Sequence, residues 1–322
     1  MCIRDSLTIV GEVENVGPGL TRTLSVQAQP GTYTSLCKPG MAGDGVGRTT
    51  FRVSGKSVEL AGDTDAEAKA AASRYVSYVR DQATTLLQRT RGFAAAYTAG
   101  DDAKARSLYP NARAYYERIE PVAEKFGKLD PQLDARQGDV AEGTSWTGWH
   151  RIEKDLWKPA AAQNGGKAYT PLTTAQRRAQ ADLLVSRTEQ LLAEVRASSF
   201  TVSADAISNG AIGLLDEVAA TKITGEEETW SHTDLYDFQA NVQGAEVAYR
   251  GVRDLAKGRS ASLVSTLDAR FASLDAQLKK YGSLEHGFIP YTALSKSDVK
   301  ALSDAVNALS EPLSTLTATV LQ

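Results

Sequence analysis

The feature that most constrains this chain is a change of hydrophobic pattern at Asp63, after which apolar residues recur with a helical period. A period near 3.6 places these residues along one face of a helix. In the first helical segment that face carries Tyr75, Val76, Val79, Ala83, Leu86 and Leu87. The sequence therefore predicts a mainly all-α protein whose helical domain spans residues 64–322.

Signals for helix ends divide this domain into about eight helices with short connections, which is typical of an antiparallel bundle. Either Asp63 or Thr64 can cap the first helix. Pro110 fits the first turn of a helix that Gly127 would end. Later helices are predicted to begin near four serines, Ser203, Ser231, Ser260 and Ser297. Residues 64–198 and 199–322 could form two four-helix halves.

Residues 7–55 have a different pattern, in which short strands alternate with turns. The stretches TLSVQAQ and TTFRVSG alternate as strands do, and the glycine-proline pairs around them predict turns. The region is too short for a complete sandwich, so we interpret it as a truncated β domain, with residues 56–63 as a linker. Residues 1–6, MCIRDS, are interpreted as a non-native leader, and the absence of a signal peptide as a result of N-terminal truncation.

The composition argues against several functional classes. The net charge is −3 and no basic cluster stands out, so nucleic acid is not the expected partner. The sequence contains no run of about 18 apolar residues, so no transmembrane helix is predicted. The chain has two cysteines, which provide neither a disulfide framework nor a cysteine metal cluster.

One histidine stands out, because the chain has only three and His150 lies one helical turn before Glu153. An imidazole and a carboxylate at this spacing can reach one ion, and carboxylate metal sites in helical bundles use the reverse order, Glu-x-x-His. Iron, manganese and zinc accept such mixed ligands. The alternative is a capped, half-buried histidine with a structural role, which this spacing alone does not exclude.

Other acidic residues are spaced in a similar way. Glu117, Glu120 and Glu124 would share one face of a continuous helix, although a solvated charged face has the same pattern. Further carboxylates follow in two later segments: Asp130 and Asp134, then Asp216, Glu217, Asp234 and Asp237. From the residues alone, the prediction is an all-α protein with an acidic metal site as one of its possible features.

Three segments resemble the imelysin-like family, and within it the iron-uptake components of EfeO type. They are ARAYYERIEPVAEKFGKLDPQLDAR, TGWHRIEKDLW and LLDEVAATKITGEEETWSHTDLYDFQANVQGA, in the order that the family has them. The stretch EVENVGPGLTRTLSVQAQPGTYTSLCKPGMAGDG is similar to the end of the cupredoxin-like domain that many members carry. The resemblance implies a periplasmic or cell-surface protein of an EfeUOB-type system. Its partners would be a membrane iron permease and a haem peroxidase-like protein.

The resemblance also implies a set of metal ligands and a cargo. The candidate ligands are His150, Glu153, Glu117, Glu120, Asp134 and Glu217. Iron, as Fe²⁺ or Fe³⁺, is the expected ion, with zinc or copper as alternatives. Trp146, Trp149 and Trp157 are expected to pack around the site. The partial β domain contains Cys37 and Met41 but no histidine, so it lacks the ligands of an electron-transfer copper centre.

Three functions follow from these observations. The first is an iron-binding transport component without enzymatic activity. The second is a metal-dependent peptidase of imelysin type, which would need an open metal position and a base, but the chain has no zinc-protease motif. The third is a module that binds an acidic polysaccharide. The lysines and arginines are scattered through the helices, and this distribution neither supports nor excludes such binding.

Overall fold

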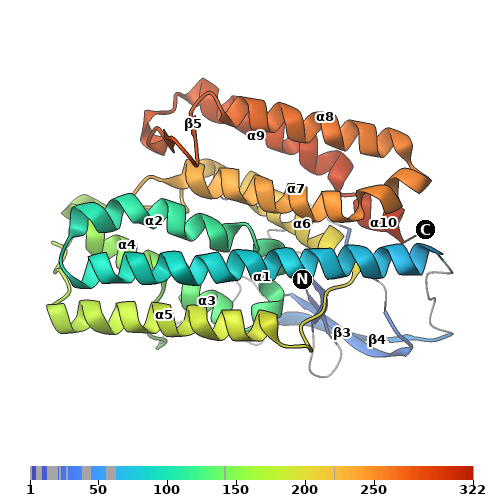
Figure 1. Cartoon of the computed structure of the whole chain (residues 1–322), viewed down its shortest axis with the longest axis horizontal. Helices are drawn as coiled ribbons and strands as arrows, with labels where there is room; N and C mark the ends of the chain where they lie inside the picture. Colours follow the sequence, from blue (N-terminus) through green and yellow to red (C-terminus); the bar gives the residue numbers. More distant parts are fainter. Residues whose placement is uncertain are drawn as a thin grey trace.

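The computed structural model describes residues 2–4, 9–12, 21, 23–26, 28–37, 45–55, 63–140, 143–220 and 222–321. Most of these residues lie in helices that pack lengthwise against one another, as Figure 1 shows. None of the helices in this described part combines the length and apolar character needed to cross a membrane. The mainly all-α prediction is confirmed.

The longer helices form two groups of four. The first group is α1 (Asp63–Thr98), α2 (Asp102–Glu117), α4 (Trp149–Trp157) and α5 (Thr174–Arg196). The second is α6 (Ala204–Ala220), α7 (Asp234–Arg259), α8 (Ala261–Leu278) and α9 (Lys296–Leu313). In the first group α1 and α4 both contact α2 and α5, and in the second α7 and α9 both contact α6 and α8. Two halves of four helices each therefore make up the bundle.

The two halves meet where α7 packs against α1 and α2. Two short α-helices complete the described helical part, α3 (Leu129–Asp134) and α10 (Leu316–Val320). Single turns of 3₁₀ helix and one longer piece connect the elements: η2 (Glu120–Phe126), η3 (Gln137–Asp139), η4 (Ala161–Gln163), η5 (Lys222–Thr224) and η6 (Tyr291–Ala293). A two-stranded ribbon, β5 (Gly282–Ser283) with β6 (Gly287–Phe288), precedes η6.

Aromatic residues fix α4 against α1 and α2. The ring of Trp149 lies 5.2 Å from that of Phe93 and 5.8 Å from that of Tyr109, measured between centroids. Trp157, at the other end of α4, lies 5.4 Å from Tyr109. The rings of Phe93, Tyr109 and Trp149 are buried, and that of Trp157 is partly buried. Their packing holds α4 in place, as predicted for the two tryptophans, and α4 is the helix that carries His150.

The helix predicted to start at Pro110 and end at Gly127 is wrong at both ends. α2 begins at Asp102, after an Asp101 side chain that accepts from the Lys104 amide at 3.1 Å, and it contains Pro110 in its interior. It ends at Glu117, because Pro121 has no N–H to continue the helical ladder. The acidic residues 117, 120 and 124 therefore do not share the face of one α-helix.

Two glycines allow the turn after α2 to lie close to the second half. A Cβ added to Gly210 on α6 would lie 1.8 Å from the carbonyl oxygen of Pro121. A Cβ added to Gly244 on α7 would lie 2.6 Å from that of Arg118. Only glycine permits backbones to approach this closely, and the approach brings Glu120 to the junction of the two halves.

The N-terminal strands form a four-stranded antiparallel sheet in the order β2-β1-β3-β4. The strands are β1 (Cys2–Arg4), β2 (Ile9–Glu12), β3 (Gly31–Cys37) and β4 (Val46–Val53). The predicted strand TTFRVSG overlaps β4, whereas the described part of TLSVQAQ is irregular. The strand lies further along, at β3, because Tyr33 and Leu36 are the residues that become buried there.

The expected leader contributes β1, which pairs with both β2 and β3. Asn209 on α6 donates to the carbonyl oxygen of Ser25 at 2.6 Å, so the N-terminal region contacts the helical bundle. Cys37 is an exposed free thiol, and Met41 lies outside the described residues. The division into leader, partial cupredoxin-like domain and linker stays a prediction.

Candidate metal centre

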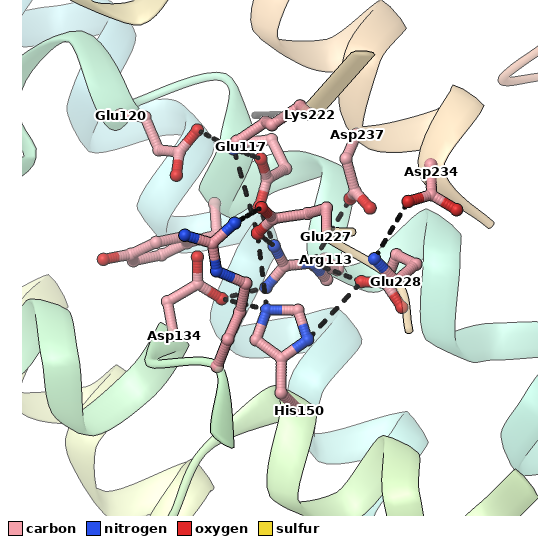
Figure 2. Close-up of polar contacts among 12 residues, drawn as sticks. Arg113, Glu117, Glu120, Asp134, His150, Lys222, Glu227, Glu228, Asp234 and Asp237 are labelled. Carbon is pink, nitrogen blue, oxygen red and sulfur yellow. Dashed lines mark hydrogen bonds and ion pairs between the residues drawn. The ribbon is translucent and has the colours of Figure 1, made fainter. Parts of the chain in front are cut away.

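Buried charged side chains gather where α2, α3 and α4 face the segment between α6 and α7. Figure 2 shows carboxylates from several elements pointing toward Arg113 and the ring of His150. The residues come from α2 (Arg113, Glu117), η2 (Glu120), α3 (Asp134), α4 (His150, Glu153), residues 222–228 (Lys222, Glu227, Glu228) and α7 (Asp234, Asp237). We call this set the acidic cluster.

His150 is held in a defined orientation at the edge of the acidic cluster. Its Nδ1 lies 3.2 Å from Oε2 of Glu153, and the side chain is 1 % exposed. The other oxygen of Glu153 accepts from the backbone amides of Trp230 at 2.9 Å and Ser231 at 2.7 Å. A carboxylate that binds one ring nitrogen fixes the tautomer and turns the second nitrogen toward a ligand.

The second ring nitrogen of His150 faces acidic oxygens without a hydrogen bond. Nε2 lies 3.4 Å from Oε1 of Glu227 and 3.7 Å from Oδ1 of Asp134, and it is buried with no hydrogen-bond partner. An imidazole nitrogen and two carboxylate oxygens at these separations form the kind of donor set that a divalent or trivalent metal ion takes.

Arg113 lies at the centre of the acidic cluster and is fully buried. Its guanidinium forms ion pairs with five carboxylates, which are Glu117 at 2.6 Å, Glu227 at 2.8 Å, Glu228 at 2.8 Å, Asp237 at 3.2 Å and Asp134. One positive charge cannot neutralise five carboxylates, so the acidic cluster still favours further cations or bound protons.

Lys222 is a second buried cation in the same place. Its Nζ lies 2.9 Å from Oε2 of Glu117 and 2.9 Å from Oε2 of Glu120. The amide of Asn241 donates to the same two oxygens, at 3.0 and 2.5 Å, and to the backbone carbonyl of Glu117 at 3.1 Å. Although Pro121 interrupts the helix, these donors bring the carboxylates of Glu117 and Glu120 together.

The crowding of charges shifts the pKa values of the acidic cluster. Burial and the neighbouring Glu153 raise the pKa of Glu228 to about 8, against the opposing effect of Arg113. For His150, burial and Arg113 act to lower the pKa, but the negative charges of Glu153, Glu227 and Glu228 beside the ring overcome them and raise it to about 9. At neutral pH the acidic cluster therefore holds protons that a metal ion would displace.

A pocket of about 590 Å³ leads to this site. His150 and Glu227 line it together with Arg136, Glu226 and Trp230, and with several polar residues. Trp230 forms one wall, and its ring lies 5.7 Å from that of Trp146. An ion can therefore reach the buried imidazole and carboxylate through the pocket.

Most of the predicted ligands lie together. Three groups have ligand atoms within 4.8 Å of one another, namely Asp134 with His150 and Glu227, His150 with Glu153 and Glu228, and Glu117 with Glu120 and Asp134. Glu217 is half-buried on α6 and belongs to none of these groups. Burial raises its pKa while Lys222 opposes the shift, so Glu217 interacts with the acidic cluster.

The sequence reasoning missed several residues of the acidic cluster. Glu227 and Glu228 were not assigned, and neither were the cations Arg113 and Lys222. The run GEEETW holds three consecutive glutamates beside a tryptophan, but a charged run of this kind is also typical of a solvated surface loop, so it does not single out Glu227 and Glu228. Apart from the i, i+4 spacing of Arg113 and Glu117, the two cations have no local signal, because their other partners are as far as 114 residues away along the chain.

Comparison with known proteins gives consistent matches. A profile of the imelysin family, peptidase M75, matches residues 71–316. An iron uptake system component EfeO from Yersinia pestis is 36% identical over 318 residues, which is 98% of this chain and 80% of that protein. An EfeM/EfeO family lipoprotein from Staphylococcus haemolyticus is 40% identical over 256 residues, covering 79% of this chain and 84% of the relative. The corresponding lipoprotein of Staphylococcus aureus is 39% identical over 252 residues.

Proposed function

The chain belongs to the imelysin family, and from this premise we propose that it is the extracytoplasmic iron-binding component of an EfeUOB-type iron-uptake system. The family match confirms the resemblance seen in the three sequence segments. Relatives with the names of iron-uptake components and lipoproteins support both the cargo and the location. The membrane permease and the haem peroxidase-like partner belong to the same proposal.

The observation that carries the proposal is the environment of His150 Nε2. This buried nitrogen has no hydrogen bond, and it faces Glu227 and Asp134 at the end of a solvent pocket. Imidazole with carboxylates suits iron, and also zinc or copper, which remain alternative ions. A structural histidine buried in this way would be expected to have both ring nitrogens satisfied.

We assign different roles to the predicted ligands. His150 and Asp134 would bind the ion directly with Glu227, and Glu117 and Glu120 would supply further oxygens next to it. Both oxygens of Glu153 already have partners, so Glu153 would orient the imidazole. Glu217, which lies on α6, would contribute to ion binding through its negative charge.

The transport function is preferred to a peptidase, although the family carries a peptidase name. A metallopeptidase needs an open metal position beside a base that is free to take a proton from water. In the acidic cluster the carboxylates near His150 are held by Arg113 or by backbone amides. This arrangement favours holding an ion over activating water.

The proposal is tested by metal binding to the purified chain, with Fe²⁺ kept under anaerobic conditions and Fe³⁺, Zn²⁺, Cu²⁺ and Mn²⁺ alongside. We expect saturable iron binding that His150→Ala removes and that Glu153→Gln weakens by about 10–100-fold. The matched control is His286→Ala, because His286 is exposed and far along the chain in the loop between β5 and β6. Equal iron binding by the His150 and His286 variants would refute the assignment.

A further inference from the structure

Lys222 places an ammonium group where the carboxylates of Glu117 and Glu120 would bind a cation. Nζ lies 2.9 Å from one oxygen of each, and the lysine side chain is 1 % exposed. Metal ions bind carboxylate oxygens at about 2.0–2.6 Å. An ion bound to either oxygen would therefore lie within about 5.5 Å of the ammonium, where two cations repel strongly in a buried site.

Resting on the function proposed above, we propose that Lys222 is an internal competitor of the cargo ion. Its ammonium occupies the Glu117–Glu120 carboxylates, lowers the affinity of this part of the acidic cluster for a metal ion, and so keeps loading reversible. The lysine side chain is flexible and carries a compact charge, which allows it to withdraw when an ion of higher charge arrives.

Two observations favour competition over a purely structural ion pair. First, Arg113 already pairs with Glu117 through the other carboxylate oxygen, at 2.6 Å, so Lys222 is not its only counter-charge. Second, Asn241 donates to the same oxygens of Glu117 and Glu120 that Lys222 contacts. The two carboxylates would therefore stay together after the ammonium leaves.

The surroundings of Lys222 explain why its charge matters for affinity. Besides its two close partners, Glu227 lies 3.9 Å from Nζ, and the half-buried Glu217 also acts on it. Glu227 belongs to the ligand group of His150 as well. A positive charge at Lys222 therefore weakens the attraction that both parts of the acidic cluster exert on an incoming ion.

The test compares Mn²⁺ binding by the full chain and its Lys222 variants, using Mn²⁺ because it does not oxidise during titration. Lys222→Met removes the charge at similar length and should bind Mn²⁺ at least about tenfold more tightly. Lys222→Arg keeps the charge and should bind no more tightly than the unsubstituted chain. Lys125→Met is the matched control, since it removes the same charge from an exposed position on η2.

The outcomes separate this inference from the proposed function. If the unsubstituted chain binds no metal ion, the proposed function fails. If it binds Mn²⁺ through His150 while Lys222→Met binds equally or more weakly, only the competitor role is refuted. Should Lys222→Met not fold, Lys222→Gln replaces it, because its amide can still donate to the carboxylates without a charge. For the inference to hold, that variant must also bind Mn²⁺ at least about tenfold more tightly than the unsubstituted chain.

Discussion

Replacing Arg113 by methionine should destabilise the metal-free protein more than any other single loss of charge in the acidic cluster. The guanidinium is fully buried and pairs with five carboxylates, so methionine would leave buried negative charges without their counter-ion. Removing one partner of a buried ion pair costs about 3–5 kcal/mol. We expect a loss of this size in the free energy of unfolding at pH 7.

The assay is urea denaturation followed by circular dichroism, in the presence of a chelator, at about pH 7 and about pH 5. The loss should shrink at the lower pH, because the carboxylates can then take up protons. Arg253→Met is the control. Arg253 also pairs with a carboxylate, that of Asp268 at 2.5 Å, but this pair lies on the surface, so the substitution should lower the free energy of unfolding far less. Equal losses for the two variants, or a loss that does not change with pH, would refute the reasoning.

Three further predictions follow from the same geometry. Because the pKa of His150 is raised to about 9, metal binding at neutral pH should release protons, measured by calorimetry in buffers of different ionisation enthalpy, and the number released should fall as the pH rises through about 9. Burial raises the pKa of Asp234 from 3.8 to about 6, so the folded protein favours the neutral carboxyl. The stability that this carboxyl contributes is complete below a pH of about 4 and is lost as the pH rises through about 6. Asp234→Asn should therefore gain up to about 3 kcal/mol relative to the parent between about pH 4 and pH 7, and a constant difference would contradict this. Gly210→Ala should cost about 1–3 kcal/mol by forcing a Cβ against the Pro121 carbonyl, whereas Gly213→Ala, with open space around it on the same helix, should not destabilise the protein in thermal melts.

The helices could be predicted because their signal is local. The spacing of Tyr75, Val79 and Leu86 is sufficient to define the buried face of α1, and all three are buried. His150 and Glu153 were found for the same reason, since one helical turn brings them into contact. Pro121 was the local signal that was overlooked, and it changes the path of the chain between Glu117 and Glu120.

The rest of the acidic cluster depends on contacts between distant segments. Lys222 meets Glu117 across 105 residues, and no pattern around either residue encodes that meeting. Glu227 and Glu228 lie in a non-helical segment, so periodicity gives no information about which of them points inward. Such residues become predictable only once the packing of α7 against α2 is known.

The bond between Glu153 and the backbone of Trp230 and Ser231 has a consequence for the speed of ion exchange. The backbone stretch that supplies Glu227 also holds Glu153, which in turn holds the His150 ring. If this stretch moved away, a carboxylate ligand and the orientation of the imidazole would be lost in one event. We therefore expect ion release, followed by stopped flow, to fit a single exponential. Its rate should rise in Glu153→Gln, because the contact between Glu153 and the backbone is weaker there. Separate phases in the traces would argue for stepwise dissociation.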